Sequence, residues 1–420
     1  MKKLLGLFMA LLLLSGCSSV ANRNNIINLL SSPKLSQRES EIVTAIKDYL
    51  GQDIILKYPK RGSNISPVQI ADLNNDGVDE AVALYSVPSY GGNVRISVLS
   101  STRDGWTVGY DSEGYGSEIY KISFDGLTQN GKKQIVVGYT FADSSEKFLA
   151  VYFVENNRVS DIMAQPCQDY MVYDVTGDGS PDIIVAGLNA NNQNTQVKVL
   201  STHYSNFLSE IAAKQLPVTN AKVTSMAFST TDFTDNAAML IDYYDTYRRV
   251  YTEAMYLDGN RLVSVLSKDV VQKIWSFDYD LNSRDVDGDG YIETPTIIAD
   301  GTASGYNLKQ MEWTNFMLSN PERKYYGVCE ANSGVFFALP DEWQNLITLV
   351  NGDEGTWQVT SAANGAILVE FDIVSAGEDN SASDNTVTVS SGTIQVKITF
   401  DTSVTSQQRE YISSSLMYIK

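Results

Sequence analysis

Three short acidic stretches carry carboxylates at alternate positions, a spacing that allows neighbouring side chains to converge on one cation. They are residues 71–85 (ADLNNDGVDEAVALY), 173–187 (YDVTGDGSPDIIVAG) and 284–299 (RDVDGDGYIETPTIIA). Calcium in proteins takes about six to eight oxygen ligands, several of them carboxylates, on a tight turn. The pattern therefore predicts up to three calcium-binding turns, called here the first, second and third acidic turns.

Each acidic turn offers five ligand positions, of which the fourth is a backbone carbonyl. The first turn offers Asp72, Asn74, Asp76, the carbonyl of Val78, and Glu80. The second turn offers Asp174, Thr176, Asp178, the carbonyl of Ser180, and Asp182. The third turn offers Asp285, Asp287, Asp289, the carbonyl of Tyr291, and Glu293. In the third turn Gly290 permits the sharp bend that brings these groups together.

The acidic turns differ from the calcium loop of an EF-hand. That loop needs an acidic residue at its twelfth position, which is Ala83, Val185 and Thr296 in the three stretches. The ligand series also ends at the ninth position and runs directly into a strand-like segment, whereas a helix would follow an EF-hand loop. Both observations exclude the EF-hand.

The turns recur within a β-rich region between about residues 53 and 320. A related turn at 123–139 (SFDGLTQNGKKQIVVGY) offers Thr128, Asn130 and Gln134 in place of carboxylates, so we expect no calcium there. A fifth, poorer unit lies at 228–244 (FSTTDFTDNAAMLIDYY). A unit of several strands that recurs at the regular interval between these turns is typical of propeller blades. The five turns together suggest five blades, but a degenerate blade could lie near residues 190–225, or the C-terminal strands could complete the ring.

The motif D-x-[DN]-x-D-G-x-x-[DE] followed by a hydrophobic strand resembles the FG-GAP/VCBS repeat of integrin alpha subunits and many bacterial surface proteins. The resemblance covers about residues 53–322. It implies a mainly β fold, a calcium-stabilised β-propeller of about five blades, and display on the cell surface. The wider layout is similar to that of bacterial lipoproteins with VCBS repeats.

Two further segments flank the predicted propeller. Residues 36–39 (SQRE) form a capping box before an amphipathic helix that Gly51 ends, within a segment 17–52. Residues 323–420 lack the acidic motif and predict a small α+β domain, with a closing helix at 406–419.

The N-terminus predicts the compartment. Lys2 and Lys3 precede an apolar run, and Leu14-Ser15-Gly16-Cys17 resembles the lipobox of bacterial lipoproteins. The resemblance implies removal of residues 1–16 and diacylation of Cys17. We therefore expect a lipid anchor on the extracytoplasmic face of a bacterial membrane, followed by a polar spacer.

The net charge limits the class of partner, and the cysteine content leaves one possible disulfide open. The net charge of −19 becomes −21 once Lys2 and Lys3 are removed, which excludes nucleic acid as a partner. Besides Cys17 the chain has Cys167 and Cys329, whose pairing stays open.

No catalytic constellation stands out. The single histidine, His203, lies in STHYSNF without a nucleophile-elbow motif. The tyrosines 243, 244, 247, 251 and 256 and the aromatics 275, 277 and 279 suit packing between blades better than a binding face. The leading hypothesis is a non-enzymatic surface module that binds a protein or glycan. The alternatives are an extracellular hydrolase or an accessory subunit of a polysaccharide enzyme, and a scaffold for the C-terminal domain.

Overall fold

The computed structural model describes most of the chain beyond the N-terminal segment. The described residues are 35–142, 144, 146–155, 158–190, 194–204, 207–235, 237–266, 281–301, 307–352, 356–374, 385–391 and 394–419. The predicted signal peptide, Cys17 and most of the predicted spacer lie outside these residues, as do the aromatics 275, 277 and 279. None of the described helices is long and apolar enough to cross a membrane.

The first described element is the expected amphipathic helix, α3 (Gln37–Leu50). Ser36 caps it, since its Oγ accepts from the Glu39 N–H while the Glu39 carboxylate accepts from the Ser36 N–H. Gly51 ends the helix in the left-handed conformation, with φ 67°. The buried face of α3 carries Ile42 and Ile46.

The remainder of the described chain is mainly β, as the sequence predicts, and forms six antiparallel sheets in chain order. The first sheet contains β1 (Ile55–Leu56), β2 (Val68–Ala71), β3 (Glu80–Ser86), β4 (Val94–Thr102) and β5 (Gly105–Glu113). The second contains β6 (Glu118–Asp125), β7 (Gln134–Thr140), β8 (Lys147–Glu155) and β9 (Arg158–Cys167). A short 3-10 turn, η1 (Pro88–Tyr90), connects β3 to β4.

The third and fourth sheets repeat the same meander, in which each strand pairs with the next one along the chain. The third contains β10 (Asp169–Tyr173), β11 (Asp182–Leu188), β12 (Thr195–Ser201) and β13 (Ser209–Gln215). The fourth contains β14 (Lys222–Ser229), β15 (Ala238–Tyr244), β16 (Val250–Asp258) and β17 (Arg261–Ser264).

The last two sheets share the C-terminal part of the chain. The fifth contains β18 (Glu293–Asp300), β19 (Leu308–Asn315), β20 (Glu322–Glu330), β21 (Val335–Ala338) and β27 (Met417–Tyr418). The sixth contains β22 (Ile347–Asn351), β23 (Trp357–Ser361), β24 (Ile367–Val374), β26 (Ile394–Phe400) and β25 (Thr386–Ser391). The 3-10 turn η2 (Asp341–Trp343) and the helix α5 (Ser406–Ser414) accompany them.

Successive sheets pack face to face, so that strands in the middle of the fold are buried on both sides. In β3, Val82 and Leu84 join a core with the second sheet, whereas Ala81, Ala83 and Tyr85 pack against α3. This assignment follows from the alternation of side chains along a strand. Similar cores lie between the second and third, third and fourth, and fifth and sixth sheets. Each large apolar side chain buried there stabilises the fold by about 1.5–3 kcal/mol.

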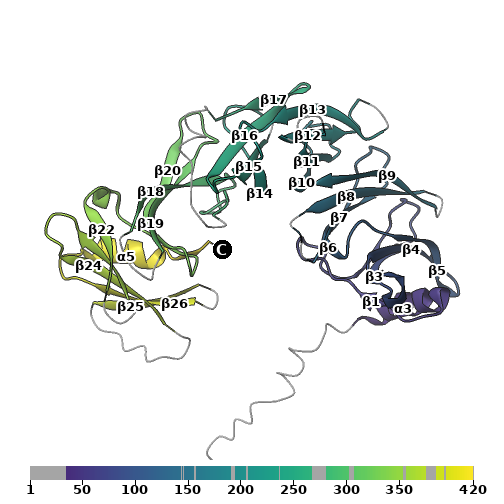
Figure 1. Ribbon diagram of the computed structural model, residues 1–420, viewed down its shortest axis with the longest axis horizontal. Coiled ribbons are helices and arrows are strands. Elements are labelled where there is room, and N and C mark those ends of the chain that lie inside the picture. The colour runs from purple at the N-terminus through teal and green to yellow at the C-terminus, as the bar shows by residue number, and fades with distance from the viewer. Residues whose placement is uncertain are drawn as a thin grey trace, which may run out of the picture.

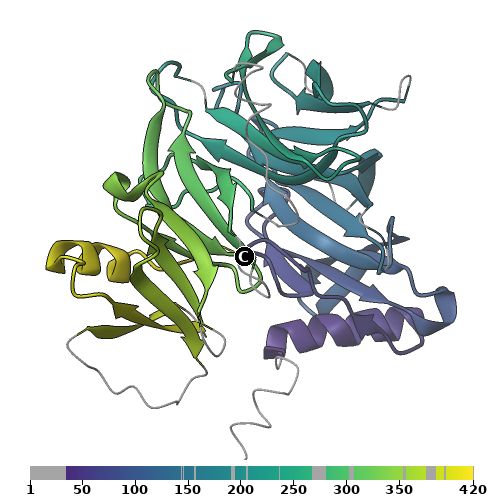
Figure 2. The same ribbon diagram turned by 60° about the vertical axis from the view of Figure 1, so that its left-hand side comes forward.

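The six sheets follow one another around an arc (Figure 1). The first sheet, covered by α3, forms one end of the arc, and the sixth sheet with α5 forms the other. Figure 2 shows α3 lying along the first sheet, in agreement with its contacts to β3 and β5. The helix therefore covers the face of the first sheet that is turned away from the second sheet.

The domain boundary expected between residues 322 and 323 falls at the start of β20, which pairs with β19. The C-terminal strand β27 returns to pair with β21 of the same sheet. The boundary thus runs through the fifth sheet, and the sixth sheet brings the number of described sheets to six, where the turns suggested five blades. The repeat motif could not indicate the sixth sheet because residues 347–400 lack the acidic turn.

The closing helix is shorter than the expected 406–419. Thr405 caps α5 with a capping box, and the helix ends at Ser414, because residues 417–418 pair as a strand instead. Ser415 stops the helix by bonding locally: its Oγ donates to the Ile412 carbonyl and accepts from the Ala338 N–H.

Candidate functional site

The first hairpin of each of the first five sheets encloses a turn of the same length. The residues paired across the base of the turn are Ala71 and Glu80, Asp125 and Gln134, Tyr173 and Asp182, Ser229 and Ala238, and Arg284 and Glu293. Eight residues lie between the partners in every case. The turn therefore occupies one recurring position in the fold, directly before the strand that begins at its ninth residue, which is β3, β7, β11, β15 or β18.

The ninth motif residue has the same hydrogen bond in four of these turns. Its side-chain oxygen accepts from the backbone N–H of the second motif residue. The four donor–acceptor pairs are Leu73 and Glu80, Leu127 and Gln134, Val175 and Asp182, and Val286 and Glu293, at 2.7–3.0 Å. The side chain of the ninth residue thus holds the start of the turn by this hydrogen bond, whether it is a carboxylate or an amide. In the 230–237 turn the ninth residue is Ala238, which has no acceptor, and Asp232 accepts instead from Ser319.

The third acidic turn brings three aspartates together. One carboxylate oxygen each of Asp285, Asp287 and Asp289 lies within 4.8 Å of the others. The Asp285 carboxylate accepts from the N–H groups of Gly288 (2.6 Å) and Gly290 (3.0 Å). Gly290 has a φ of 88°, a conformation that favours glycine and permits this tight bend.

Glu293, the ninth residue of this turn, lies on the buried side of the three exposed aspartates. Its side chain is fully buried, and its Oε2 accepts from the Val286 N–H. Among the described residues nothing donates to its buried Oε1. Burial and the charges of the three neighbouring aspartates together raise the pKa of Glu293 to about 7, against the opposing hydrogen bond from the Val286 N–H. A buried carboxylate with an unmatched oxygen is costly unless a positive charge reaches it.

Lys324, from β20, is a cation that the sequence motif does not reveal. Its ammonium group lies 2.9 Å from Asp289 and 3.6 Å from Asp287. The hydrogen bond to Asp289 raises the pKa of Lys324 and, from the other side, lowers the pKa of Asp289. Lys324 therefore neutralises the outer edge of the cluster.

The first acidic turn has a similar interior. The Asp72 carboxylate accepts from the N–H groups of Asn75 (2.7 Å) and Gly77 (2.9 Å). The Asn74 amide nitrogen donates to Glu80 (2.8 Å), and the buried Asn74 Oδ1 lacks a donor in the described structure. Burial is the main cause that raises the pKa of Glu80, which is only 2% exposed.

In the second acidic turn, Asp174 accepts from the N–H groups of Gly177 (2.7 Å) and Gly179 (2.8 Å). Asp182 is buried, which raises its pKa, and it accepts from the N–H groups of Val175 and Thr176. Its three aspartates do not converge as closely as those of the third turn.

The backbone at the fourth ligand position is held in the same way in all three turns. The N–H groups of Val78, Ser180 and Tyr291 donate to the preceding aspartates, Asp76, Asp178 and Asp289, at 2.8–2.9 Å. This bond fixes the peptide unit whose neighbouring carbonyl the sequence predicts as a ligand.

The 126–134 turn, called here the amide turn, satisfies its own polar groups. The Gln134 Oε1 accepts from the Leu127 N–H (2.7 Å), and the Gln134 Nε2 donates to the Lys132 carbonyl (3.4 Å). Asn130 Oδ1 accepts from Thr128 Oγ1 and the Lys132 N–H. With neutral side chains at these positions, the turn has no charge for a cation to compensate.

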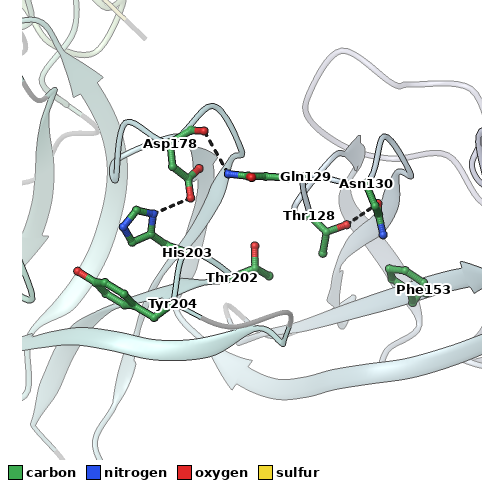
Figure 3. A pocket seen from close by; sticks show the side chains of 8 residues that line it. All are labelled: Thr128, Gln129, Asn130, Phe153, Asp178, Thr202, His203 and Tyr204. Carbon is green, nitrogen blue, oxygen red and sulfur yellow. Dashed lines mark hydrogen bonds and ion pairs between the residues drawn. The ribbon is translucent and has the colours of Figure 1, made fainter.

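His203 lies in an exposed turn, and the structure pairs it with Asp178, a predicted calcium ligand. Its Nδ1 lies 2.7 Å from Asp178 Oδ2, and its ring contacts Tyr204 edge to face (Figure 3). Sequence reasoning missed the contact because His203 lies on a different hairpin, twenty-five residues from Asp178. The imidazole occupies one oxygen of Asp178 while Ser180 donates to the other.

The cysteines and the clustered tyrosines do not belong to the acidic turns. No disulfide joins Cys167 and Cys329, which are buried in the second and fifth sheets. Burial raises the pKa of Cys167 to about 12, so its thiol is protonated at neutral pH. Tyr243 and Tyr251 stack in the core as expected (ring centroids 5.6 Å apart), whereas Tyr247 is 73% exposed.

Comparisons with known proteins give only distant likenesses. No family model matches the chain, and no curated protein matches it. Among solved structures, the rhamnogalacturonan lyase PL11 of Bacillus licheniformis has 11% identity and a TM-score of 0.34, covering 75% of this chain and 69% of its own. The Sqt1 protein of Chaetomium thermophilum has 10% identity and a TM-score of 0.35, covering 83% and 81%. A protein from Lactobacillus plantarum has 12% identity and a TM-score of 0.30, covering 60% and 69%.

Proposed function

We propose that this chain is a lipid-anchored protein on the extracytoplasmic face of a bacterial membrane. Its sheets act as propeller-type blades of the FG-GAP/VCBS kind, and its acidic turns bind calcium as a structural cofactor. The assembled sheets serve as a module that binds a protein or a glycan. The lipobox-like sequence at residues 14–17 supports the anchor, and loss of membrane association in a Cys17→Ser variant would test it.

The observation that carries the calcium proposal is the buried Glu293 carboxylate, which has an unmatched oxygen beside three converging aspartates. The amide turn supplies the comparison within the same chain. There Gln134 occupies the equivalent position and uses its amide nitrogen internally. The carboxylate turns have the same backbone scaffold but an excess of negative charge that a divalent cation would balance.

In the third turn, the side chains of Asp285, Asp287, Asp289 and Glu293 with the Tyr291 carbonyl would hold the ion. Calcium supplies two positive charges and accepts oxygen ligands in flexible geometry. The equivalent groups of the first turn are Asp72, Asn74, Asp76, Glu80 and the Val78 carbonyl. Those of the second turn are Asp174, Thr176, Asp178, Asp182 and the Ser180 carbonyl. The donor sets contain only oxygen, which suits calcium and disfavours zinc.

Thermal unfolding of the full-length chain in mild detergent tests the proposal. Extracellular calcium modules have Kd values of roughly 10⁻⁴–10⁻³ M, so one millimolar calcium stabilises each filled site by about 1 kcal/mol. We expect the melting temperature to fall in EDTA and the calcium-dependent part to shrink in Asp289→Ala.

The matched control is Asn130→Ala in the amide turn, which should leave the effect of calcium unchanged. An identical melting temperature in calcium and in EDTA would contradict the proposal.

A further inference from the structure

A cavity of about 780 Å³ lies where the second and third sheets meet. It is bordered by the amide turn, by the second acidic turn and by the start of the β12–β13 connection (Figure 3). Its volume falls within the roughly 300–1,000 Å³ of small-molecule sites. The lining residues are Thr128, Gln129, Asn130, Phe153, Asp178, Thr202, His203 and Tyr204.

The polar lining groups are held in place before any ligand arrives. The Gln129 Nε2 donates to the Asp178 carbonyl (3.3 Å), which links the amide turn to the second acidic turn. The Asn130 amide is fixed by bonds to its oxygen, and the Asp178 carboxylate is fixed between His203 and the Ser180 N–H. Such pre-organisation lowers the entropic cost of binding.

Two aromatic rings flank these polar groups from opposite sides, Tyr204 on one and Phe153 on the other (Figure 3). Tyr204 is 64% exposed, which leaves its ring accessible. Aromatic rings offer flat apolar surfaces with little conformational entropy to lose. The ring of a sugar has an apolar face of C–H groups that matches such a surface, and hydroxyls around its edge.

The lining also disfavours other ligand classes. Among the described lining residues none is lysine or arginine, and one carboxylate is present. A phosphate, sulfate or uronate group would therefore meet no lysine or arginine among these lining residues, and His203 is already paired with Asp178, in a chain whose net charge is −19. The same residues include no aliphatic side chain, so an apolar ligand or peptide side chain would find few contacts.

We propose that this cavity binds a neutral saccharide, with hydroxyls recognised by Gln129, Asn130 and Asp178, and a sugar face packed on Tyr204. The inference rests on the proposed function as a binding module and specifies its ligand class. The proposal also gives the amide turn a role: it keeps the backbone of the acidic turns but has no carboxylates, and its side chains line the cavity.

The test is binding of the full-length chain, in mild detergent and millimolar calcium, to an array of neutral and acidic oligosaccharides. The neutral set contains glucose, galactose, mannose, fucose and N-acetylglucosamine units, and the acidic set contains uronates and sulfated sugars. We expect binding within the neutral set. Tyr204→Ala and Gln129→Ala should each raise the Kd about tenfold, the change for losing a contact of ~1.4 kcal/mol.

Tyr49→Ala is the matched control, because Tyr49 is 60% exposed on α3, far from the cavity in the sequence and in a different element. It should leave the Kd unchanged. Absence of binding to every neutral saccharide, preference for acidic ones, or equal Kd values in all three variants would overturn the proposal.

Melting temperatures of the same preparation in calcium and in EDTA distinguish failure of the saccharide proposal from failure of the calcium proposal. If calcium stabilises the chain but no saccharide binds, the saccharide site fails and the calcium-stabilised module stands. If calcium has no effect while saccharide binding responds to the Tyr204 and Gln129 substitutions, the cavity site stands and the calcium role fails.

Discussion

Ionisation of the Glu293 carboxyl group is unfavourable in its present surroundings, and a bound cation would offset this cost. It is fully buried beside three aspartates, and burial with their charges raises its pKa to about 7. The equivalent residue of the amide turn, Gln134, occupies the same backbone position without charge. At this position the two turns differ by a carboxylate in place of an amide, and the amide turn also lacks the three aspartates.

The substitution Glu293→Gln should convert the third acidic turn toward the amide turn. We expect the metal-free variant to melt at or above the temperature of the metal-free parent, because a buried charge is removed while the bond from Val286 is kept. The variant should also lose about one third of the stabilisation by calcium. Melting curves of both proteins in EDTA and in calcium measure this. A variant that melts well below the parent in EDTA would contradict the account.

The pH dependence of the metal-free chain follows from the raised pKa of Glu293. Because the folded-state pKa, about 7, exceeds the ordinary value of 4.5, the protonated form favours folding. The contribution of Glu293 is fully present below about pH 4.5 and is lost as the pH rises through 7. In EDTA we expect the parent to lose more stability than Glu293→Gln between pH 5 and pH 7.5. Parallel pH profiles of the two proteins would contradict this prediction.

At the scale of elements, β20 supplies a positively charged side chain, Lys324, to the third acidic turn. Lys324 pairs with Asp289 and Asp287 and so occupies oxygens that calcium would use. The variant Lys324→Met keeps most of the apolar stem and removes the charge. We expect it to bind calcium at the third turn several-fold more tightly, since a competing cation is gone.

Calorimetric titration of Lys324→Met and of the parent checks the expectation. Lys132→Met, a lysine of the amide turn, serves as control and should leave calcium affinity unchanged. Weaker calcium binding by Lys324→Met would show that Lys324 supports the site instead of competing with it.

The strands and turns of the first five sheets were within reach of sequence analysis, because alternating burial and the acidic motif are local signals. The helix α3 was predictable for the same reason, from its capping box and its apolar spacing. The contacts of Lys324 and His203 with the acidic turns were not, since they join residues on different hairpins. The extent of the fifth sheet was missed because its last strand, β27, pairs with a strand about eighty residues earlier.

At the scale of the whole molecule, stability is distributed over a series of interfaces between consecutive sheets. The second and third sheets each contribute apolar side chains to two neighbours, as Ile183 and Ile184 do from opposite faces of β11. The first sheet has a sheet on one side, and α3 covers the other with Ile42 and Ile46. The helix thus acts as a cap at one end of the arc (Figure 1).

The packing of α3 on the first sheet predicts a stability effect that does not depend on a calcium ligand. Ile46 is fully buried on the inner face of α3, so Ile46→Ala should lower the free energy of unfolding by about 2–5 kcal/mol. Tyr49→Ala on the exposed face of the same helix should change it by less than about 0.5 kcal/mol. Denaturant unfolding in calcium measures both. Equal stability of the two variants would mean that α3 does not cap the first sheet.

The central claim, that the acidic turns bind calcium, is tested most directly by counting the ions bound per chain. Equilibrium dialysis against millimolar calcium, with the metal measured by atomic emission, gives that number for the parent and for Asp76→Ala, Asp178→Ala and Asp289→Ala. The account predicts up to three ions in the parent, one fewer in each variant whose turn is filled, and no change in Asn130→Ala. A parent that binds no calcium, or variants that bind as much as the parent, would contradict it.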